Sequence, residues 1–206
     1  MKAKIAVFDY CETLVNMQTG NDFINFYIHR NAGIITRIAA YCISYFRIFK
    51  RRRKGLLLRL LSGESLDSIE RTADLYASQR LEAQENKNVI AFMKRLEQEG
   101  YRVIILSAGY SVYITSHNKK FKADKVIAND FCYVNATFTG RLIQEDCYGS
   151  NKLKRLEVAF SDEKIDYEKS YFFSDCMSDL PLFKIFGNSF LVTRQNIVPF
   201  SENQVS

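Results

Sequence analysis

The sequence is poor in the residues that build zinc sites and disulfide frameworks. Its 206 residues include two histidines, His29 and His117, and five cysteines, which are an odd number and contain no CxxC pair. Disulfide-linked secreted domains have paired cysteines, and structural zinc sites need closely spaced cysteines and histidines. The composition therefore excludes both classes and indicates reduced thiols, as in a cytoplasmic protein.

Membrane spans, internal repeats and low-complexity segments are also lacking. The most apolar stretch, residues 32–49, is interrupted by Arg37 and Arg47. It is shorter than the roughly 20 apolar residues that a transmembrane helix needs, so we expect a helix within a helical unit. At the amino terminus two lysines lead directly into a short apolar strand, and we expect no cleavable signal.

The chain does contain enough apolar residues to fill one sizeable core. Hydrophobic residues make up 47% of the chain and charged residues 25%, which is typical of a globular protein. The 29 basic residues outnumber the 23 acidic ones and give a net charge of +6. This excess favours an anionic partner: a phosphorylated small molecule, a membrane surface or nucleic acid.

Short apolar runs alternate with helical patterns along most of the chain. Residues 85–100 are an example of such a helical pattern. Val89, Met93 and Leu96 would fall on one face of this helix. The apolar runs are typical of buried parallel strands, and their alternation with helices predicts a doubly wound α/β sheet. The predicted strands are residues 4–9, 102–107, 125–129, 170–175 and 189–193.

Two segments depart from this alternation. Residues 16 to about 84 contain aromatic and aliphatic helical stretches but no convincing strand, which predicts a helical insertion after the first strand. Residues 132–143 alternate apolar and polar side chains around Asn135 and Gly140, which is typical of a β-hairpin. The sequence thus predicts one α/β core interrupted by a helical unit.

Three of the predicted strands end in reactive side chains. Asp9 ends the first and Ser107 the second, and a third strand ends at Asp175, with Asp179 shortly after it. Ligands of an open parallel sheet collect beyond the carboxyl ends of its strands, so we expect these side chains in one crevice. Clustered carboxylates repel one another unless a cation holds them, and oxygen ligands without histidine suit Mg²⁺. Lys152 is a candidate to attract an anionic substrate.

Four short motifs follow one another along the chain in this order: "FDYCETL", "ILSAG", "GSNK" and "FFSDCMSDLP". They resemble the motifs of the haloacid dehalogenase-like superfamily and are most similar to its phosphoserine-phosphatase-like branch. The resemblance spans residues 4 to about 193. It implies a Rossmann-like parallel sheet with an inserted helical cap. Residues 1–15 and 85–206 would form the α/β core domain, and residues 16–84 the cap.

The resemblance implies a metal site built from the first and last motifs. Asp9 and Asp175 match the family's two carboxylate ligands of Mg²⁺, and the backbone carbonyl of Cys11 matches a third ligand. Asp179 matches an acid beyond these ligands, which orients Lys152 or a water on the metal. The expected cofactor is therefore Mg²⁺.

The resemblance also implies how the phosphoryl group is handled. Asp9 matches the nucleophile that takes this group as an aspartyl phosphate, which splits one hard displacement into two easier ones. Ser107 matches the hydroxyl that hydrogen-bonds the phosphoryl oxygens. Lys152 matches the cation that neutralises Asp9 and the phosphate. We therefore expect a Mg²⁺-dependent phosphatase acting on a phosphate monoester.

Cys11 departs from the family pattern. Family phosphatases usually have an aspartate there, which protonates the leaving oxygen and later takes a proton from the attacking water. Such acid and base help is worth about 10² to 10⁴ in rate, and a thiol with an ordinary pKa of roughly 8.5 supplies it poorly. Three functions stay open. They are a phosphatase slowed at Cys11, a phosphotransferase with a long-lived aspartyl phosphate, and a catalytically weak protein that binds a phosphorylated ligand or partner.

Residues 46–59 carry a basic run that includes residues 50–54, "KRRRK". Such runs often form solvated helix faces. Joined to the apolar stretch 32–49, the run also suits an anionic membrane surface. A membrane-facing cap would fit a lipid-linked phosphate, and a solvated cap a soluble sugar or amino-acid phosphate. We expect a cytoplasmic protein, free or membrane-peripheral, and no nucleic-acid partner, because no recognised motif accompanies the charge.

Overall fold

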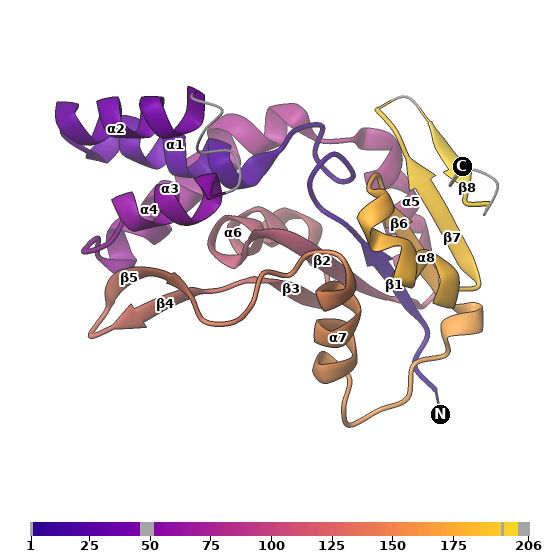
Figure 1. Cartoon of the computed structure of the whole chain (residues 1–206). Helices are drawn as coiled ribbons and strands as arrows, with labels where there is room; N and C mark the ends of the chain where they lie inside the picture. The colour runs from indigo at the N-terminus through magenta and orange to yellow at the C-terminus, as the bar shows by residue number, and fades with distance from the viewer. Residues whose placement is uncertain (1, 46–51, 195, 202–206) are drawn as a thin grey trace.

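A six-stranded sheet forms the centre of the molecule (Figure 1). The computed structural model describes residues 2–45, 52–194 and 196–201. The first five strands in spatial order are parallel, and the sixth pairs antiparallel with the fifth. The predicted α/β fold with a largely parallel sheet is confirmed. In spatial order the strands are β3 (Lys125–Asn129), β2 (Arg102–Tyr110), β1 (Ile5–Phe8), β6 (Tyr171–Ser174), β7 (Asn188–Val192) and β8 (Ile197–Pro199).

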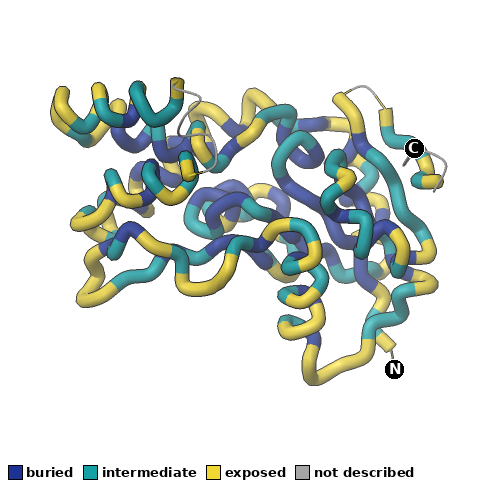
Figure 2. Tube along the Cα trace, viewed as in Figure 1, coloured by how far each residue is buried: buried dark blue, intermediate teal, exposed yellow. Residues whose placement is uncertain are grey.

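Both faces of the sheet are covered, and the central strand β1 shows why. All four of its residues are buried, and successive side chains point to opposite faces. Ala6 and Phe8 pack into one hydrophobic cluster, whereas Ile5 and Val7 pack into the other. Figure 2 colours the buried segments at the centre of the molecule dark blue. A strand buried on both faces needs the continuous apolar run seen in the sequence. The covering helices are α5 (Lys87–Gln98) and α6 (Ser111–Phe121) on the first face, and α7 (Ser150–Ala159) and α8 (Leu180–Ile185) on the second.

Most predicted strands agree with the observed ones to within one residue at each end, and two differences are larger. Strand β2 continues past residue 107 to Tyr110, with a shift of its register against β3 after Leu106. Strand β8 lies outside the predicted set. It is three residues long and only partly buried, so it lacks the apolar run that marks the central strands.

Helix α5 occupies most of the range predicted for it, 85–100. It begins after Asn86, whose side chain accepts a hydrogen bond from the backbone nitrogen of Val89. It ends shortly before Gly100, which has a φ of 85°. Glycine adopts this left-handed conformation without the steric penalty that a Cβ brings, and it stops the helix there.

The chain between β1 and β2 is helical, as predicted for the insertion. The helix expected over residues 32–49 forms at 34–45, residues 32 and 33 precede it in non-helical conformation, and residues 46–51, which include part of the basic run, lie outside the described residues. The division into a core and a cap domain stays a prediction. In the described part of the chain, no helix combines the length and apolar character that crossing a membrane requires. The elements are α1 (Thr19–Asn31), α2 (Ile34–Tyr45), α3 (Arg53–Leu60), α4 (Leu66–Tyr76), the π-helical η2 (Ala77–Leu81) and the 3₁₀ turn η3 (Glu82–Gln84).

A hairpin of β4 (Phe131–Val134) and β5 (Thr137–Leu142) lies beside α3 and α4 (Figure 1) and is hydrogen-bonded to the loop between these helices. It agrees with the hairpin predicted over 132–143. The backbone nitrogen of Gly63 donates to the carbonyl of Phe138 at 2.9 Å, and the nitrogen of Phe138 donates to the carbonyl of Glu64 at 2.8 Å.

An aromatic cluster joins the helical unit to the core. Phe23 of α1 and Tyr76 of α4 pack against Tyr113 of α6, with ring centroids 5.0 and 5.4 Å from that of Tyr113. Tyr110 at the end of β2 packs edge-on against the same ring at 6.0 Å. All four side chains are buried. The helices after β1 are therefore held over the carboxyl end of the sheet by close aromatic packing.

Candidate active site

Side chains from the carboxyl ends of three neighbouring strands meet in one pocket. Asp9 follows β1, Ser107 lies in the last part of β2, and Asp175 follows β6. With Cys11 and Lys152, they line a cavity of about 310 Å³. This is the edge where an open parallel sheet binds its ligands, and the cavity suits a small molecule.

Lys152 lies between two carboxylates in the wall of the pocket. Its Nζ lies 3.0 Å from Oδ2 of Asp9 and 2.6 Å from Oδ2 of Asp179. All three side chains are buried. Burial lowers the pKa of Lys152, but the two carboxylates outweigh it and raise the pKa above its ordinary value. Burial raises the pKa of Asp9, although Lys152 opposes this effect. The charge of Asp9 thus depends on nearby cations.

Removing the Lys152 cation should destabilise the fold. Lys152→Met leaves the buried carboxylates of Asp9 and Asp179 without their partner, so we expect the free energy of unfolding to fall by about 3–5 kcal/mol. Urea unfolding followed by circular dichroism would measure the change. Lys154→Met, on the exposed side of the same helix, should stay within about 0.5 kcal/mol of the wild type. Equal losses in the two variants would contradict this account.

Ser174, at the end of β6, was not among the predicted site residues. Its hydroxyl donates to Oδ2 of Asp179 at 2.7 Å and lies 3.4 Å from Oδ2 of Asp9. It also accepts a hydrogen bond from the backbone nitrogen of Cys176. Ser174 therefore ties both acids to the loop that follows the strand. The motif "FFSDC" places this serine next to Asp175, which is the signal that could have identified it.

Asp175 is the second carboxylate of the pocket. Its Oδ1 accepts a hydrogen bond from Oγ1 of Thr13 at 3.3 Å, and its backbone nitrogen donates to the same hydroxyl at 3.1 Å. Burial, with a further contribution from the charge of Asp9, raises the pKa of Asp175 to about 7. Two carboxyls whose pKa values are raised in one pocket would both be stabilised in their charged form by a cation.

The pocket offers few protein ligands for a metal ion. This suits Mg²⁺ better than a metal ion whose ligands all come from protein side chains. Among the described residues, no group of three or more histidine, cysteine, aspartate or glutamate side chains is placed to hold a metal ion. Asp9 and Asp175 offer two carboxylates, and the chain at Cys11 offers a backbone carbonyl. Mg²⁺ commonly takes one or two protein carboxylates and fills its remaining positions with water and phosphate.

The thiol of Cys11 is engaged within the protein. Its Sγ lies 2.9 Å from Oγ1 of Thr19, and that hydroxyl contacts the hydroxyl of Tyr113 at 2.6 Å. Burial, and then the charge of Asp9, raise the pKa of the thiol. A thiol with a raised pKa gives up its proton reluctantly, so Cys11 is a weaker acid here than in water.

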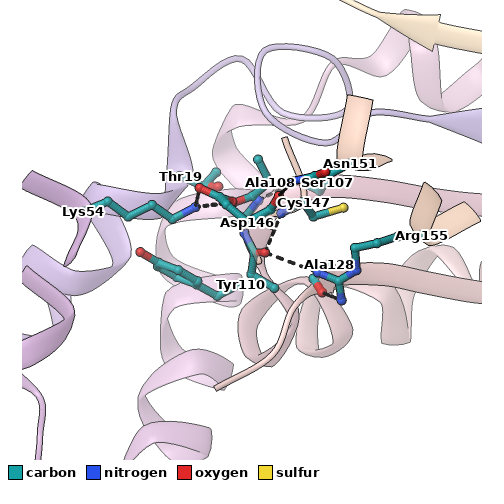
Figure 3. A network of polar contacts seen from close by, with 12 residues as sticks. Thr19, Lys54, Ser107, Ala108, Tyr110, Ala128, Asp146, Cys147, Asn151 and Arg155 are labelled. Atoms are coloured by element: carbon teal, nitrogen blue, oxygen red, sulfur yellow. Dashed lines mark hydrogen bonds and ion pairs between the residues drawn. The ribbon is translucent and has the colours of Figure 1, made fainter. Parts of the chain in front are cut away.

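Lys54 and Asp146 also line the pocket, and the sequence did not single them out as site residues. Lys54 reaches in from α3, and its Nζ lies 2.7 Å from Oδ1 of Asp146 and 3.1 Å from the carbonyl oxygen of Ala108 (Figure 3). The side chain of Asn129 donates to the same two partners, at 2.7 Å each. The two charged residues are 92 positions apart, and no motif marks Asp146.

The sequence profile of the haloacid dehalogenase-like hydrolases matches residues 6–184, most of the chain. The chain belongs to the haloacid dehalogenase-like hydrolases. The matched range includes all the predicted site residues of this hydrolase, from Asp9 to Asp179. The family resemblance inferred from the four motifs is therefore confirmed.

Comparison with individual proteins relates this hydrolase to phosphoserine phosphatases. The phosphoserine phosphatase of Methanocaldococcus jannaschii is 27% identical over 192 residues, covering 90% of this chain and 83% of the relative. A protein of unknown function from Bordetella pertussis Tohama I superposes with a TM-score of 0.77 and 17% identity, covering 92% and 89% of the two chains. A phosphoserine phosphatase solved as a phospho-aspartyl intermediate analogue gives a TM-score of 0.57 and 21% identity, covering 92% and 86%. The structural likenesses show the shared fold, and the family and the sequence relative support a phosphoric monoester hydrolase.

Proposed function

We propose that this hydrolase removes the phosphoryl group from a small phosphate monoester, with Asp9 as the nucleophile and Mg²⁺ as the cofactor. The observation that carries the proposal is the buried Asp9 at the end of the central strand, 3.0 Å from the Lys152 cation. Ser107 and Asp175 line the same pocket. The relationship to a phosphoserine phosphatase supports the class of reaction, and a phospho-aspartyl analogue has been solved for another protein of that name.

The reaction would proceed in two displacements. In the first, a carboxylate oxygen of Asp9 forms a bond to phosphorus while the bond from phosphorus to the ester oxygen breaks, and the departing oxygen gains a proton. In the second, water attacks phosphorus, loses a proton and releases phosphate, which restores the carboxylate. Lys152 would balance the charge of Asp9 and the phosphoryl group, and the hydroxyl of Ser107 would donate to a phosphoryl oxygen.

Asp9, Asp175 and the backbone carbonyl of Cys11 would hold the Mg²⁺ ion, and Asp179 would act from outside these ligands by orienting Lys152. When bound, the ion would neutralise the phosphoryl oxygens. A panel of sugar, amino-acid and lipid-linked phosphates, assayed for phosphate release with Mg²⁺ and with a chelator, tests the proposal. Release that survives complete removal of the metal would contradict it.

Binding of Mg²⁺ should be weaker in acid. The carboxyl of Asp175, with a pKa of about 7, is largely ionised at pH 8 and largely protonated at pH 6. Since the metal binds the ionised form, its apparent affinity should fall about tenfold between these pH values. Melting temperatures in Mg²⁺ titrations would give both affinities. Asp175→Asn should remove most of the Mg²⁺-dependent rise, and equal affinities at the two pH values in the wild type would refute this role of Asp175.

A phosphotransferase is a second candidate. It is favoured because the thiol of Cys11 is already engaged by Thr19 and is not free to exchange protons with water or the leaving group. With no carboxyl at position 11 to activate water, an aspartyl phosphate would persist until another acceptor reached it. A protein that binds a phosphorylated ligand with little turnover is the third candidate. Rapid labelling of Asp9 followed by slow release to water would favour the phosphotransferase, and an absence of labelling would favour the binding protein. A cytoplasmic or membrane-peripheral location is part of the same proposal.

A further inference from the structure

Helix α2 presents an apolar face that the described part of the chain leaves uncovered. Ala40 is the one buried residue of this helix. Side chains recurring at intervals of three and four residues share one face of a helix, and α2 has large hydrophobic ones at such intervals. They are between 57% and 81% exposed and comprise Ile34, Ile35, Ile38 and Tyr41.

The sequence around this face contains no acidic residue. Residues 23–63 include nine lysines and arginines but no aspartate or glutamate. Because the whole chain has 29 basic and 23 acidic residues, the remainder has 20 basic and 23 acidic residues. The positive charge of the protein is thus concentrated in the segment that carries the exposed apolar face.

Contacts in the structure place several of these cations close to α2. Arg37 is exposed on the helix itself. The Nε of Arg53 donates to the carbonyl of Ile43 at 3.2 Å, which holds the start of α3 against the end of α2. Arg52, next to Arg53, is exposed. Lys54 is different because it pairs with Asp146 at the pocket. The bordering arginines are therefore Arg37 on α2 itself, and Arg52 and Arg53 at the start of α3, which contacts α2 through Arg53.

We propose that this face of α2 and its bordering arginines form a docking surface for an anionic lipid bilayer. Aliphatic and tyrosine side chains would enter the boundary between headgroups and acyl chains, while the arginines contact anionic headgroups. The described part of α2, 12 residues long, does not reach the length that crosses a bilayer, and we propose that it lies in the bilayer surface.

Charge argues against the other partners of such a face. A second copy of the chain, packed face to face about a two-fold axis, would bring two copies of the basic, acid-free segment 23–63 together. Nucleic acid matches the charge but offers no apolar layer for four exposed hydrophobic side chains. A bilayer with anionic lipid supplies both.

Sedimentation with vesicles tests the proposal without depending on turnover. The full chain should bind vesicles of phosphatidylcholine with phosphatidylglycerol and bind much less to phosphatidylcholine alone. Ile35→Asp with Ile38→Asp should lower the partition coefficient at least tenfold. Arg37→Gln with Arg52→Gln should lower the partition coefficient by roughly 25-fold, because the loss of each cation should lower it by about fivefold. Asp9→Asn should bind like the wild type, which separates docking from the proposed catalysis.

Matched changes elsewhere on the surface serve as controls. Val158 on α7 and Lys94 on α5 are also exposed, so Val158→Asp and Lys94→Gln should leave vesicle binding unchanged. The surface variants on α2, α3, α5 and α7 should keep the melting temperature of the wild type. Binding that is insensitive to the changes in α2 would overturn the proposal. So would failure to bind anionic vesicles, or a dimer in solution that Ile35→Asp with Ile38→Asp dissociates, which would assign the face to a second copy.

Discussion

Asp9→Asn should abolish phosphate release, with a fall in the turnover rate of about 10⁴-fold or more. The amide keeps the size and position of the carboxyl but is a poor nucleophile towards phosphorus. It also removes one negative charge beside Lys152, whose Nζ lies 3.0 Å from Asp9. Steady-state phosphate release and single-turnover labelling of the protein would both measure the loss, since no aspartyl phosphate could form.

Glu12 offers a matched control, because it is an acid in the same loop. Its carboxylate lies 3.5 Å from Nε of Arg194, and it is not among the residues that line the pocket. We therefore expect Glu12→Gln to change turnover by no more than a few fold. Turnover that persists in Asp9→Asn, with a fold shown intact by circular dichroism, would disprove the proposed mechanism.

Cys11→Asp should raise turnover by roughly 10²-fold, the lower end of what acid and base help contributes. A carboxyl at this position could protonate the departing oxygen and then accept a proton from the attacking water. The thiol of Cys11, with a raised pKa and a contact to Thr19, is expected to do both poorly. Pre-steady-state kinetics with a labelled substrate would show whether the aspartyl phosphate on Asp9 also becomes shorter lived.

Cys11→Ser is the control for this gain. Serine has a similar size and can keep the contact to Oγ1 of Thr19, but its hydroxyl is an even weaker acid than a thiol. Its turnover should stay at or below that of the wild type. If Cys11→Asp changes neither turnover nor the lifetime of the aspartyl phosphate, Cys11 does not limit the reaction.

The sequence was most informative about the buried centre of the fold. Strands β1 and β6 are buried on both faces, and only a continuous apolar run satisfies such a position. The short edge strand β8 is half exposed, so its residues are not constrained to be apolar. The end of β2 was placed too early because Ser107 interrupts an apolar run while the backbone continues in strand form to Tyr110.

Some residues of the candidate site could likewise be predicted from the sequence, and others could not. Asp9 and Asp175 are the last residues of two predicted strands, so sheet geometry alone brings them to one edge. Lys54 and Asp146 meet only because the helices after β1 pack back over the sheet, and no local pattern encodes a contact between residues 92 positions apart. Cys11 was visible only through its departure from a family pattern, and the structure adds that its thiol contacts Thr19.

The aromatic cluster between the helical unit and the core has a consequence for cooperativity. Separating the rings of Phe23 and Tyr76 from Tyr113 would expose large apolar surfaces on both sides at once. The helices after β1 and the sheet edge beneath them are therefore expected to open as one unit in hydrogen exchange, with protection of similar strength in both. Small ligands would then exchange through the mouth of the pocket while the packed rings stay in contact.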